Sequence, residues 1–401
     1  MKIGLVCPAS LPATQFGGIM FLCLDIARGS AALGHNITIY TTDLDFANNA
    51  TTFNKNLSRK EIIDNFTIKR FHTWFRYSLF FVNPGIYFQM MKDAPDIIHT
   101  IGIRSFQSFI AAIVSKKKKI PLVISDQGGL TTHPDLKNSN FFKKILHRVQ
   151  FILIKFIINQ ATKITVPNTY EKNIFLEFSE PSKIEVVKNG INLETLKTST
   201  KDFKKKYNLN CKFILFIGRF SKVKGIDVLL NAIKIIKNRT ELQNFKFVIM
   251  GVDFGFQNKM FEMINDLHIK EKILVIKNPS REDVIAAYKE SEFLVLPSRW
   301  ELSPLTPLEG FAFKKPVIST NAHGIPFTIK HGIQGILVEP ENYQQLADAI
   351  LELVRDENKR NSFGIAGFDM VTKECNSLTM TKNTLKIYEK ILDKTSETVK
   401  T

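Results

Sequence analysis

Two glutamates, Glu301 and Glu309, have seven residues between them in the segment WELSPLTPLEGF, which follows the apolar run FLVLP. The run predicts a buried strand, so this spacing lets Glu301 end the loop after the strand while Glu309 enters the next helix. A helix start offers unpaired N–H groups and a positive dipole end, which suit a phosphate. Carboxylates beside a phosphate are repelled unless they bind another group, and sugar hydroxyls are suitable partners. The segment therefore indicates a phosphorylated sugar compound as ligand.

Two cations strengthen this interpretation, because glutamates at this spacing also occur on many ordinary surface helices. In FILFIGRFSKVKGIDVLLNAIKII, a predicted strand ends at Gly218 and is followed by Arg219, then by Lys224 and an amphipathic helix. The loop between a strand and a helix is where an α/β sheet binds anions, and Arg and Lys side chains hold phosphates. The two segments together predict one site for a phosphorylated sugar.

Strands and helices alternate along the chain in two series, and such alternation predicts parallel sheets. The first series of strands is KIGLVCP, NITIYTT, TIKRFH, DIIHT, PLVISD and KITVP, and the second is FILFIG, FKFVIM, ILVIK, FLVLP, KPVIST and GILVEP. We therefore expect an α/β protein of two doubly wound parallel-sheet domains, residues 1–195 and 205–370, facing each other across a cleft. The last segment, 371–401, has a helical pattern over 371–391 and no following strand, so it could pack back on the first domain.

Composition sets further limits. A chain of 401 residues with 44% hydrophobic content can build two cores, and it lacks the run of about 20 apolar residues that a membrane span requires. The start reads as a strand and a loop rather than a signal peptide, so a cytoplasmic protein is expected. Four cysteines without disulfide or metal-ligand spacing are expected to be reduced and structural. The net charge of +17 fits nucleic acid, an acidic membrane, acidic substrates or a compositional bias of the source, so charge alone decides nothing, and no nucleic-acid motif accompanies it.

The motifs resemble those of family-4 glycosyltransferases, retaining enzymes of the GT-B architecture with two Rossmann-like domains. The matching segments are the Gly17-Gly18 loop, VVKNGINLE, IGRFSKVKG, PSRWELSPLTPLEGFAFKKPVIST and HGIPFTIKHGIQGILVEPEN, which occur in the family's order. The resemblance implies that the second domain binds a nucleotide diphosphate sugar and that the first binds the acceptor. It implies transfer to a glycan or lipid-linked acceptor, without a metal or other cofactor, in the assembly of cell-surface polysaccharide, glycolipid or protein glycan.

The resemblance assigns catalytic roles to three residues. Arg219 and Lys224 match the pair that grips the donor diphosphate and steadies its charge as it leaves, and Glu301 matches the residue near the transferred sugar. The physics agrees, because an Arg, a Lys and helix N–H groups can stabilise developing negative charge without a metal. The mechanism implied is a front-face one, in which the departing phosphate takes the acceptor proton.

The same resemblance assigns the donor-binding residues. Glu309 matches the residue that hydrogen-bonds the ribose, and backbone N–H groups of the following loop contact the phosphates or the sugar. Glycines in the first domain let its backbone approach the phosphates, because no side chain intervenes. The predicted donor-binding residues are Gly17, Gly18, Gln127, Gly218, Leu305, Thr306 and Glu309.

Several positions depart from the family pattern. Asp126 and Gln127 precede Gly128 where a His before Gly is common, although Gln127 can still hydrogen-bond a sugar hydroxyl. Pro304 stands where Gly is common and removes one N–H donor, and Phe327 stands where Glu is frequent. These changes bear on the identity of the sugar more than on the type of reaction.

Acceptor-side and metal candidates in the first domain rest on single residues. His99 closes the strand DIIHT and points at the cleft if the sheet is parallel, and Asp126 follows the next strand; the alternative for His99 is a structural histidine with satisfied nitrogens. Asp43 and Asp45 in TTDLD imitate an Asp-x-Asp metal site, but they lack supporting ligands and are expected in a solvated loop. We therefore predict no metal site.

A basic, apolar stretch marks the putative acceptor domain. Residues 138–163 carry Lys and Arg but no acid, and a helical pattern groups Val149, Ile152 and Phe156 largely on one side. Such a helix can lie in an anionic membrane surface, although a core-facing helix with a solvated basic face has the same pattern. Residues 70–81 add aromatic and basic side chains of the kind found at headgroup depth. We expect a peripheral protein on the cytosolic membrane face.

Two other functions fit the same fold. A non-catalytic protein could bind a nucleotide sugar or a membrane, but the presence of both cations and both glutamates argues against it. A nucleotide-sugar epimerase would use one substrate and need acid/base groups in both domains. The sequence favours the glycosyltransferase.

Overall fold

The chain folds into two compact units. A computed structural model describes residues 1–400 except 48–50, 78–79, 128–129, 131–140 and 198–201, and describes no side chains at 77, 141–147 and 395–400. The first unit comprises Met1–Asn189 and Ser377–Thr401, and the second Gly190–Asn376. Each unit is built around one sheet, of eight and six strands respectively. The predicted α/β class with two doubly wound parallel sheets is therefore confirmed.

The first sheet has the strand order β12-β11-β10-β9-β1-β2-β6-β5, and every neighbour is parallel except β5, which is antiparallel to β6. The strand order reverses between β1 and β9, and ligands of such sheets bind outside the carboxyl ends of the strands at this point. The strands are β1 (Lys2–Val6), β2 (Asn36–Thr42), β5 (Lys60–Ile63), β6 (Phe66–Phe71), β9 (Ile97–Ile101), β10 (Leu122–Ser125), β11 (Lys163–Val166) and β12 (Ile184–Val186). Two short antiparallel ribbons accompany it, β3 (Leu44–Phe46) with β4 (Thr52–Phe53) and β7 (Phe75–Tyr77) with β8 (Phe80–Val82).

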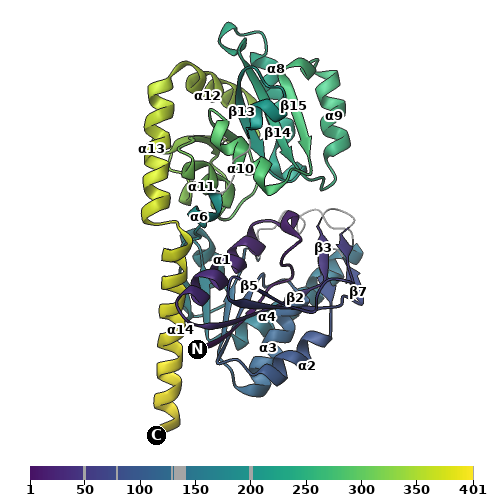
Figure 1. Cartoon of the computed structure of the whole chain (residues 1–401), viewed down its shortest axis with the longest axis vertical. Helices are drawn as coiled ribbons and strands as arrows, with labels where there is room; N and C mark the ends of the chain where they lie inside the picture. The colour runs from purple at the N-terminus through teal and green to yellow at the C-terminus, as the bar shows by residue number, and fades with distance from the viewer. Residues whose placement is uncertain (48–50, 78–79, 128–129, 131–140, 198–201, 401) are drawn as a thin grey trace. The chain divides into compact units, whose positions relative to one another are not determined.

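Helices cover both faces of the first sheet, because successive side chains of a strand point to opposite faces and each face is apolar. Leu5 belongs to the cluster beneath α1 and α14, whereas the adjacent Val6 belongs to the cluster beneath α2, α3 and α4. The helix α14 packs along α1 (Figure 1). The helices of this unit are α1 (Gly18–Ala32), α2 (Gly85–Asp93), α3 (Phe106–Lys118), α4 (Phe141–Gln160), α5 (Thr169–Leu176) and α14 (Ser377–Lys400).

The single helix expected over 371–391 is two helices, since α13 ends at Lys373 and α14 begins at Ser377. The backbone between them pairs with the segment that leaves the first sheet. Ile191 N–H donates to the Cys375 carbonyl at 3.0 Å, and Ile191 and Asn376 form a parallel bridge. Extended backbone cannot continue a helix, so this pairing ends the helical pattern. It lies where the chain leaves the second unit and returns to the first.

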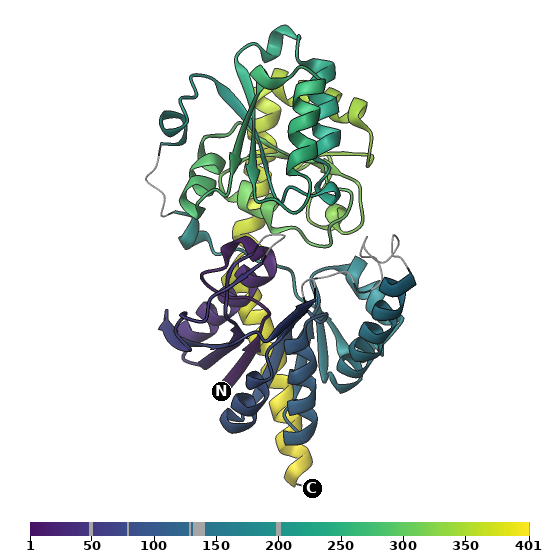
Figure 2. The same cartoon turned by 90° about the vertical axis from the view of Figure 1, so that its right-hand side faces the viewer.

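The second sheet has the order β15-β14-β13-β16-β17-β18, with all neighbours parallel. The chain adds β14 and then β15 on one side of β13, and it then returns to add β16, β17 and β18 on the other side. Right-handed connections therefore place α8 and α9 on one face and α10 and α11 on the other, as the two views show (Figures 1 and 2). The point of reversal lies between β13 and β16. The strands are β13 (Lys212–Ile217), β14 (Phe245–Gly251), β15 (Ile273–Lys277), β16 (Leu294–Leu296), β17 (Val317–Thr320) and β18 (Gly335–Val338).

The helices of the second unit are α6 (Leu193–Leu196), α7 (Phe203–Lys206), α8 (Ile226–Ile236), α9 (Gln257–Asp266), α10 (Arg281–Glu290), α11 (Leu305–Ala312), α12 (Tyr343–Arg355) and α13 (Glu357–Lys373). Short 3-10 turns add η1 (Thr14–Phe16), η3 (Pro181–Lys183), η4 (Lys222–Lys224), η5 (Thr240–Leu242), η6 (Lys270–Lys272) and η7 (Ile325–Phe327). The interior of β13 is continuously buried, which is typical of a parallel strand covered on both faces.

Candidate functional site

Arg219 lies directly beyond β13, at the point where the second sheet reverses its strand order. The ends of β13 and β14 are close together, because a Cβ on Gly251 would lie 1.8 Å from the Gly218 carbonyl oxygen. The guanidinium of Arg219 lies over the Phe254 ring, 4.5 Å from its centroid. Burial lowers the pKa of Arg219, and the nearby Glu301 carboxylate opposes that shift. A partly desolvated cation is thus held beside a carboxylate at the carboxyl edge of the sheet.

Lys224 and Glu301 form an ion pair at this edge, between Lys224 Nζ and Glu301 Oε1. Lys224 ends the turn η4, and Gly225 follows it with φ of 69° in the left-handed region. A Cβ on Gly225 would lie 1.9 Å from the Pro297 carbonyl oxygen, so this close approach requires glycine. The fold therefore brings the three predicted catalytic residues together, two from the loop after β13 and one from the loop after β16.

Arg299 links these two loops, and the sequence motifs did not identify it as a site residue. Its guanidinium donates to both carboxylate oxygens of Asp227, at 2.7 and 2.8 Å, and to the Lys222 carbonyl oxygen at 2.5 Å. Burial alone would lower the pKa of Arg299, but the hydrogen bonds to Asp227 and Glu341 outweigh it and raise the pKa. The backbone N–H of Arg299 also donates to the Val223 carbonyl at 2.7 Å. Arg299 is therefore a positioning residue for Lys224.

Glu309 lies within α11 and is held by side chains of α10. Its Oε1 accepts from Arg281 Nη2 at 2.5 Å, and its Oε2 accepts from the Tyr288 hydroxyl at 2.8 Å. Tyr288 is buried and stacks on Phe313, with ring centroids 6.1 Å apart. A carboxylate has about four acceptor positions, so these two bonds fix Glu309 and leave capacity for a ligand hydroxyl.

The N-terminus of α11 offers backbone N–H groups of the kind that suit an anion. Pro304 occupies the N-cap position, and its side chain makes no capping hydrogen bond. The N–H groups of Leu305 and Thr306 begin the helix, where phosphates bind favourably. The Gly324 N–H donates to the Glu301 carbonyl at 3.0 Å and fixes the loop that leads into α11.

In the first unit, the predicted glycines lie between β1 and α1, where that sheet also reverses its strand order. Gly17 has φ of 96°, a conformation that favours glycine, and Gly18 is the first residue of α1. Gln127 follows β10 and exchanges two hydrogen bonds with the Asn189 amide, at 3.1 and 3.3 Å. Gly128 lies outside the described residues. The structure thus places Gly17 and Gln127 near the carboxyl ends of strands in the same sheet.

His99 and Asp126 lie inside the first unit. His99 Nδ1 is 2.5 Å from the Tyr388 hydroxyl and Nε2 is 2.7 Å from Ser125 Oγ, so both ring nitrogens have protein partners. Burial lowers the pKa of His99 to about 3, which keeps the ring neutral. This is the structural role that the sequence analysis set against an acceptor role. Asp126 is likewise buried.

Two family models match the chain in succession. Residues 16–195 match Glycosyltransferase Family 4, and residues 197–370 match Glycosyl transferases group 1. The chain belongs to the family 4 glycosyltransferases. Its predicted identity as a glycosyltransferase of this retaining family is therefore confirmed.

Relatives and solved structures agree with the family. An uncharacterised glycosyltransferase of Methanocaldococcus jannaschii is 28% identical over 75% of this chain and 77% of its own length. The UDP-Gal:α-D-GlcNAc-diphosphoundecaprenol α-1,3-galactosyltransferase of Escherichia coli is 24% identical over 72% of this chain and 76% of its own. The crystal structure of Anabaena HepE in complex with UDP and glucose has a TM-score of 0.76 at 16% identity, covering 97% of this chain and 99% of its own. The glycosyltransferase thus has the predicted GT-B fold.

Asp43 of this glycosyltransferase does not lie in a solvated loop, and that expectation was wrong. Asp43 is fully buried, and its carboxylate is bound by His72 Nδ1 at 2.6 Å and by the Thr73 N–H at 3.0 Å. These partners come from the chain beyond β6, which sequence spacing did not reveal. Within the described residues, no group of three or more His, Cys, Asp or Glu side chains could hold a metal ion.

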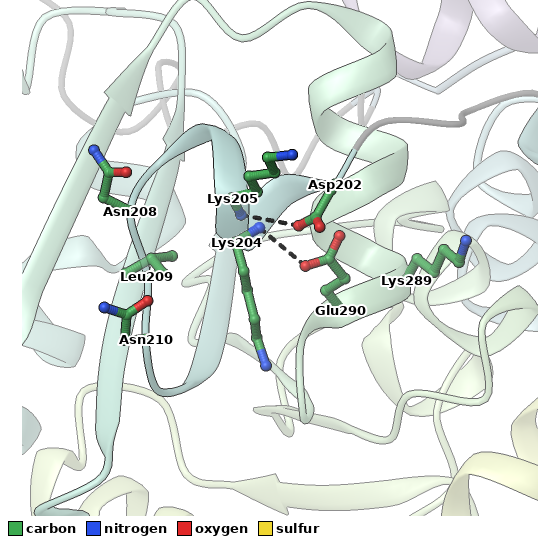
Figure 3. Close-up of a pocket in the computed structure, with 8 residues that line it drawn as sticks. All are labelled: Asp202, Lys204, Lys205, Asn208, Leu209, Asn210, Lys289 and Glu290. Carbon is green, nitrogen blue, oxygen red and sulfur yellow. Dashed lines mark hydrogen bonds between the residues drawn. The ribbon is translucent and has the colours of Figure 1, made fainter.

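A cavity of about 670 Å³ in the second unit of the glycosyltransferase lies apart from these residues (Figure 3). Its carboxylates serve the backbone of α7: Asp202 accepts from the Lys205 N–H at 2.9 Å, and Glu290 accepts from the Lys204 N–H at 3.0 Å. None of the predicted site residues lines this cavity. We assign these carboxylates to helix capping.

The helix α4 of the glycosyltransferase exposes apolar side chains beside cations. Val149 is 51% exposed and Ile152 66%, whereas Ile154, Ile157 and Ile158 of the same helix are buried. Arg148 and Lys155 are exposed with the first pair. Among the described residues, no helix is long and apolar enough to cross a membrane.

Proposed function

We propose that this glycosyltransferase moves a sugar, with retention of configuration, from a nucleotide diphosphate sugar bound by residues 205–370 to an acceptor bound by residues 1–195. The observation that carries the proposal is the convergence of Arg219 and Lys224 with Glu301, which lies in the loop that leads into the N-terminus of α11. HepE, which shares the fold, has been crystallised with UDP and glucose. A uridine nucleotide is therefore the first donor to test.

Arg219, Lys224 and the first N–H groups of α11 would bind the diphosphate and stabilise its charge as it departs. The bond from the sugar anomeric carbon to the phosphate oxygen breaks, and a bond to the acceptor oxygen forms on the same face. The acceptor proton passes to the departing phosphate. These cations and N–H groups meet the demand for charge stabilisation, so we propose a reaction that needs no metal.

Glu301 has a second role in this proposal. In the structure its carboxylate neutralises Lys224. When a diphosphate binds, the phosphate can take over Lys224, and the Glu301 carboxylate then accepts hydrogen bonds from hydroxyls of the transferred sugar. Glu309, fixed by Arg281 and Tyr288, would accept from the ribose hydroxyls. Gly17, Gly18 and Gln127 of the first unit remain proposed donor-binding residues.

A thermal-shift panel of UDP, GDP, ADP and their sugars tests the donor site, because a ligand that binds the folded state raises the melting temperature. We expect one nucleotide family to stabilise the wild type, and the shift to disappear in Arg219→Ala and Glu309→Ala. Arg239→Ala, which removes an exposed arginine of the same unit, is the matched control. A shift that survives in both site variants would overturn the site.

We further propose a lipid-linked acceptor in polysaccharide or glycan assembly on the cytosolic membrane face. The Escherichia coli relative is named for a diphosphoundecaprenol acceptor. The exposed Val149 and Ile152 of α4, beside Arg148 and Lys155, can lie in an anionic bilayer surface.

Flotation with vesicles of phosphatidylglycerol and phosphatidylcholine tests this contact. The wild type is expected to float, and Val149→Ser with Ile152→Ser to remain in solution. Ile333→Ser with Ile365→Ser removes equally exposed apolar side chains from the second unit and serves as control. An unchanged flotation of the α4 variant would contradict the contact. In product assays, an epimerised sugar formed without any acceptor would contradict transfer itself.

A further inference from the structure

A basic cavity of about 600 Å³ lies at the β5–β6 edge of the first sheet, beside the end of α2. Its charged lining consists of Arg59, Lys60, Lys69, Arg70, Lys92 and Asp93. Five permanently charged cationic residues therefore line the cavity with one carboxylate residue. None of these residues has a role in the proposed transfer reaction.

Three carboxylates neutralise three of the cations. Lys69 Nζ donates to Asp93 Oδ2 at 2.6 Å, and Arg70 Nη2 donates to Glu61 Oε2 at 2.6 Å. Arg59 is 3.8 Å from Asp43, with half of its side chain exposed. Asp93 also accepts from Tyr40 and Gln89. Partial burial would raise the pKa of Asp93, but these hydrogen bonds outweigh it and lower the pKa, so Asp93 stays ionised and bound to Lys69.

Lys60 and Lys92 form no ion pair within the described part of the chain. Lys60 is directly opposite Lys69 in the antiparallel pair of β5 and β6. Asp93 neutralises Lys69 of this pair, so Lys60 and Lys92 are the lining cations that lack a carboxylate partner in the described part of the chain. An anion held by both Lys60 and Lys92 would neutralise these two lining cations.

We propose that this cavity binds a phosphate ester. Arg59 offers the planar fork that matches phosphate oxygens, and Lys60 and Lys92 offer point charges on flexible stems. Exposed aromatic side chains lie close to the lining residues along the chain: Trp74 is 73% exposed and Phe88, in α2, is 71% exposed. Aromatic side chains at such positions are typical of the headgroup region of a membrane. The expected source of the phosphate is therefore the headgroup of an anionic phospholipid, and the other source is a soluble phosphate.

Lys60→Gln with Lys92→Gln tests the cavity, because both side chains are exposed and unpaired there and their loss leaves the packing intact. Lys246→Gln with Lys270→Gln removes the same charge from exposed positions of the second unit. Binding is measured on phosphatidylcholine vesicles with and without phosphatidylglycerol, and separately as the thermal shift given by inorganic phosphate and by sn-glycerol 3-phosphate. The shift given by the donor nucleotide reports that the fold and the donor site are intact.

The cavity variant is expected to bind the anionic vesicles about tenfold or more weakly than wild type, and the control variant to bind like wild type. A phosphate-induced shift of the wild type that the cavity variant loses, without any difference on vesicles, would assign a soluble phosphate instead. Equal losses in the cavity and control variants would reduce the effect to net charge and overturn the proposal. Wild-type behaviour of the cavity variant in both assays would overturn it as well. Neither result bears on the proposed donor site, which the nucleotide-induced thermal shift tests independently.

Discussion

The strand ends of the two units differ in how they are held. In the second unit the side chains there are charged and paired, as in Lys224 with Glu301 and Arg299 with Asp227. In the first unit, two contacts near the reversal of strand order are neutral, the Gln127–Asn189 amide pair and the contact of His99 with Tyr388, although Asp43 beyond β2 is a paired carboxylate. Both sheets reverse their strand order, but these contacts near the reversal are charged in the second and neutral in the first.

This difference matches the chemistry of the proposed ligands. An ion pair such as Lys224–Glu301 can open when a diphosphate arrives, because one anion replaces another at the cation and little charge is left uncompensated. A neutral buried network offers no such exchange, and it keeps its geometry whether or not a ligand is bound. We therefore expect the charged contacts of the second unit to respond to a charged donor, and the neutral contacts of the first to keep their geometry.

The largest effect is expected from Arg219→Ala, which removes a cation from the charged site. Loss of one group that stabilises the charge developing in a transition state costs about 100- to 1,000-fold in kcat. Chromatographic detection of the transferred sugar measures this loss, and the melting temperature reports the fold. A variant that kept kcat would show that the cluster at β13 does not stabilise the leaving group.

Arg299→Ala is expected to destabilise the second unit by about 2 kcal/mol, because Asp227 loses both hydrogen bonds in a half-buried setting. Urea unfolding measures the change, and weaker nucleotide binding is expected through the displaced η4 turn. Arg355→Ala is the control, because Arg355 binds Glu241 with half of its side chain exposed. Such surface pairs contribute at most about 1 kcal/mol. Equal losses in the two variants would mean that Arg299 is an ordinary surface arginine.

The fold and the main cluster could be predicted because they depend on local patterns. Apolar runs bounded by loops mark strands that are buried on both faces, and the alternation of strands with helices dictates parallel sheets. Arg219 and Glu301 are 82 positions apart in sequence, yet each lies in the loop after a strand, and β13 and β16 are neighbours in the sheet. Their proximity follows from strand order.

The partners of these residues could not be predicted, because they depend on side chains that meet only after the helices pack. Arg299 and Asp227 are 72 positions apart, and Tyr288 reaches Glu309 from a different helix. The break between α13 and α14 contains no Pro or Gly that could mark it in the sequence. It arises from pairing of the chain with Ile191. Tertiary contacts overrode a helical pattern there.

Glu171→Gln tests how a buried carboxyl group of the first unit makes stability depend on pH. Glu171 is buried near Asp126, and neither of its carboxylate oxygens has a hydrogen-bond partner in the described structure. Burial, with a contribution from Asp126, raises the pKa of Glu171 well above its usual value. The folded state therefore holds a proton that the unfolded state releases, and stability falls as pH rises from about 4.5 toward the raised pKa. Glutamine removes this dependence.

Urea unfolding of wild type and Glu171→Gln between about pH 5 and pH 8 measures the effect. The variant is expected to be at least as stable as wild type at the upper end, with the advantage shrinking as pH falls. Glu177→Gln, an exposed carboxylate beyond the same helix, is the control and should follow the wild type. If the wild type instead became more stable relative to the variant as pH rose, Glu171 would be ionised in the folded protein.

The smallest effect is expected from Tyr388→Phe, which removes the hydroxyl that binds His99 Nδ1 and leaves the ring packing unchanged. A buried ring nitrogen without its partner costs about 1 kcal/mol or slightly more, measured by urea unfolding. Tyr343→Phe removes an exposed hydroxyl of α12 and should cost nothing measurable. Because the network belongs to the first unit and is neutral, the nucleotide-induced thermal shift should be the same in Tyr388→Phe and wild type. A loss of that shift would contradict the separation of a fixed neutral network from a responsive charged site, since it would couple α14 to donor binding.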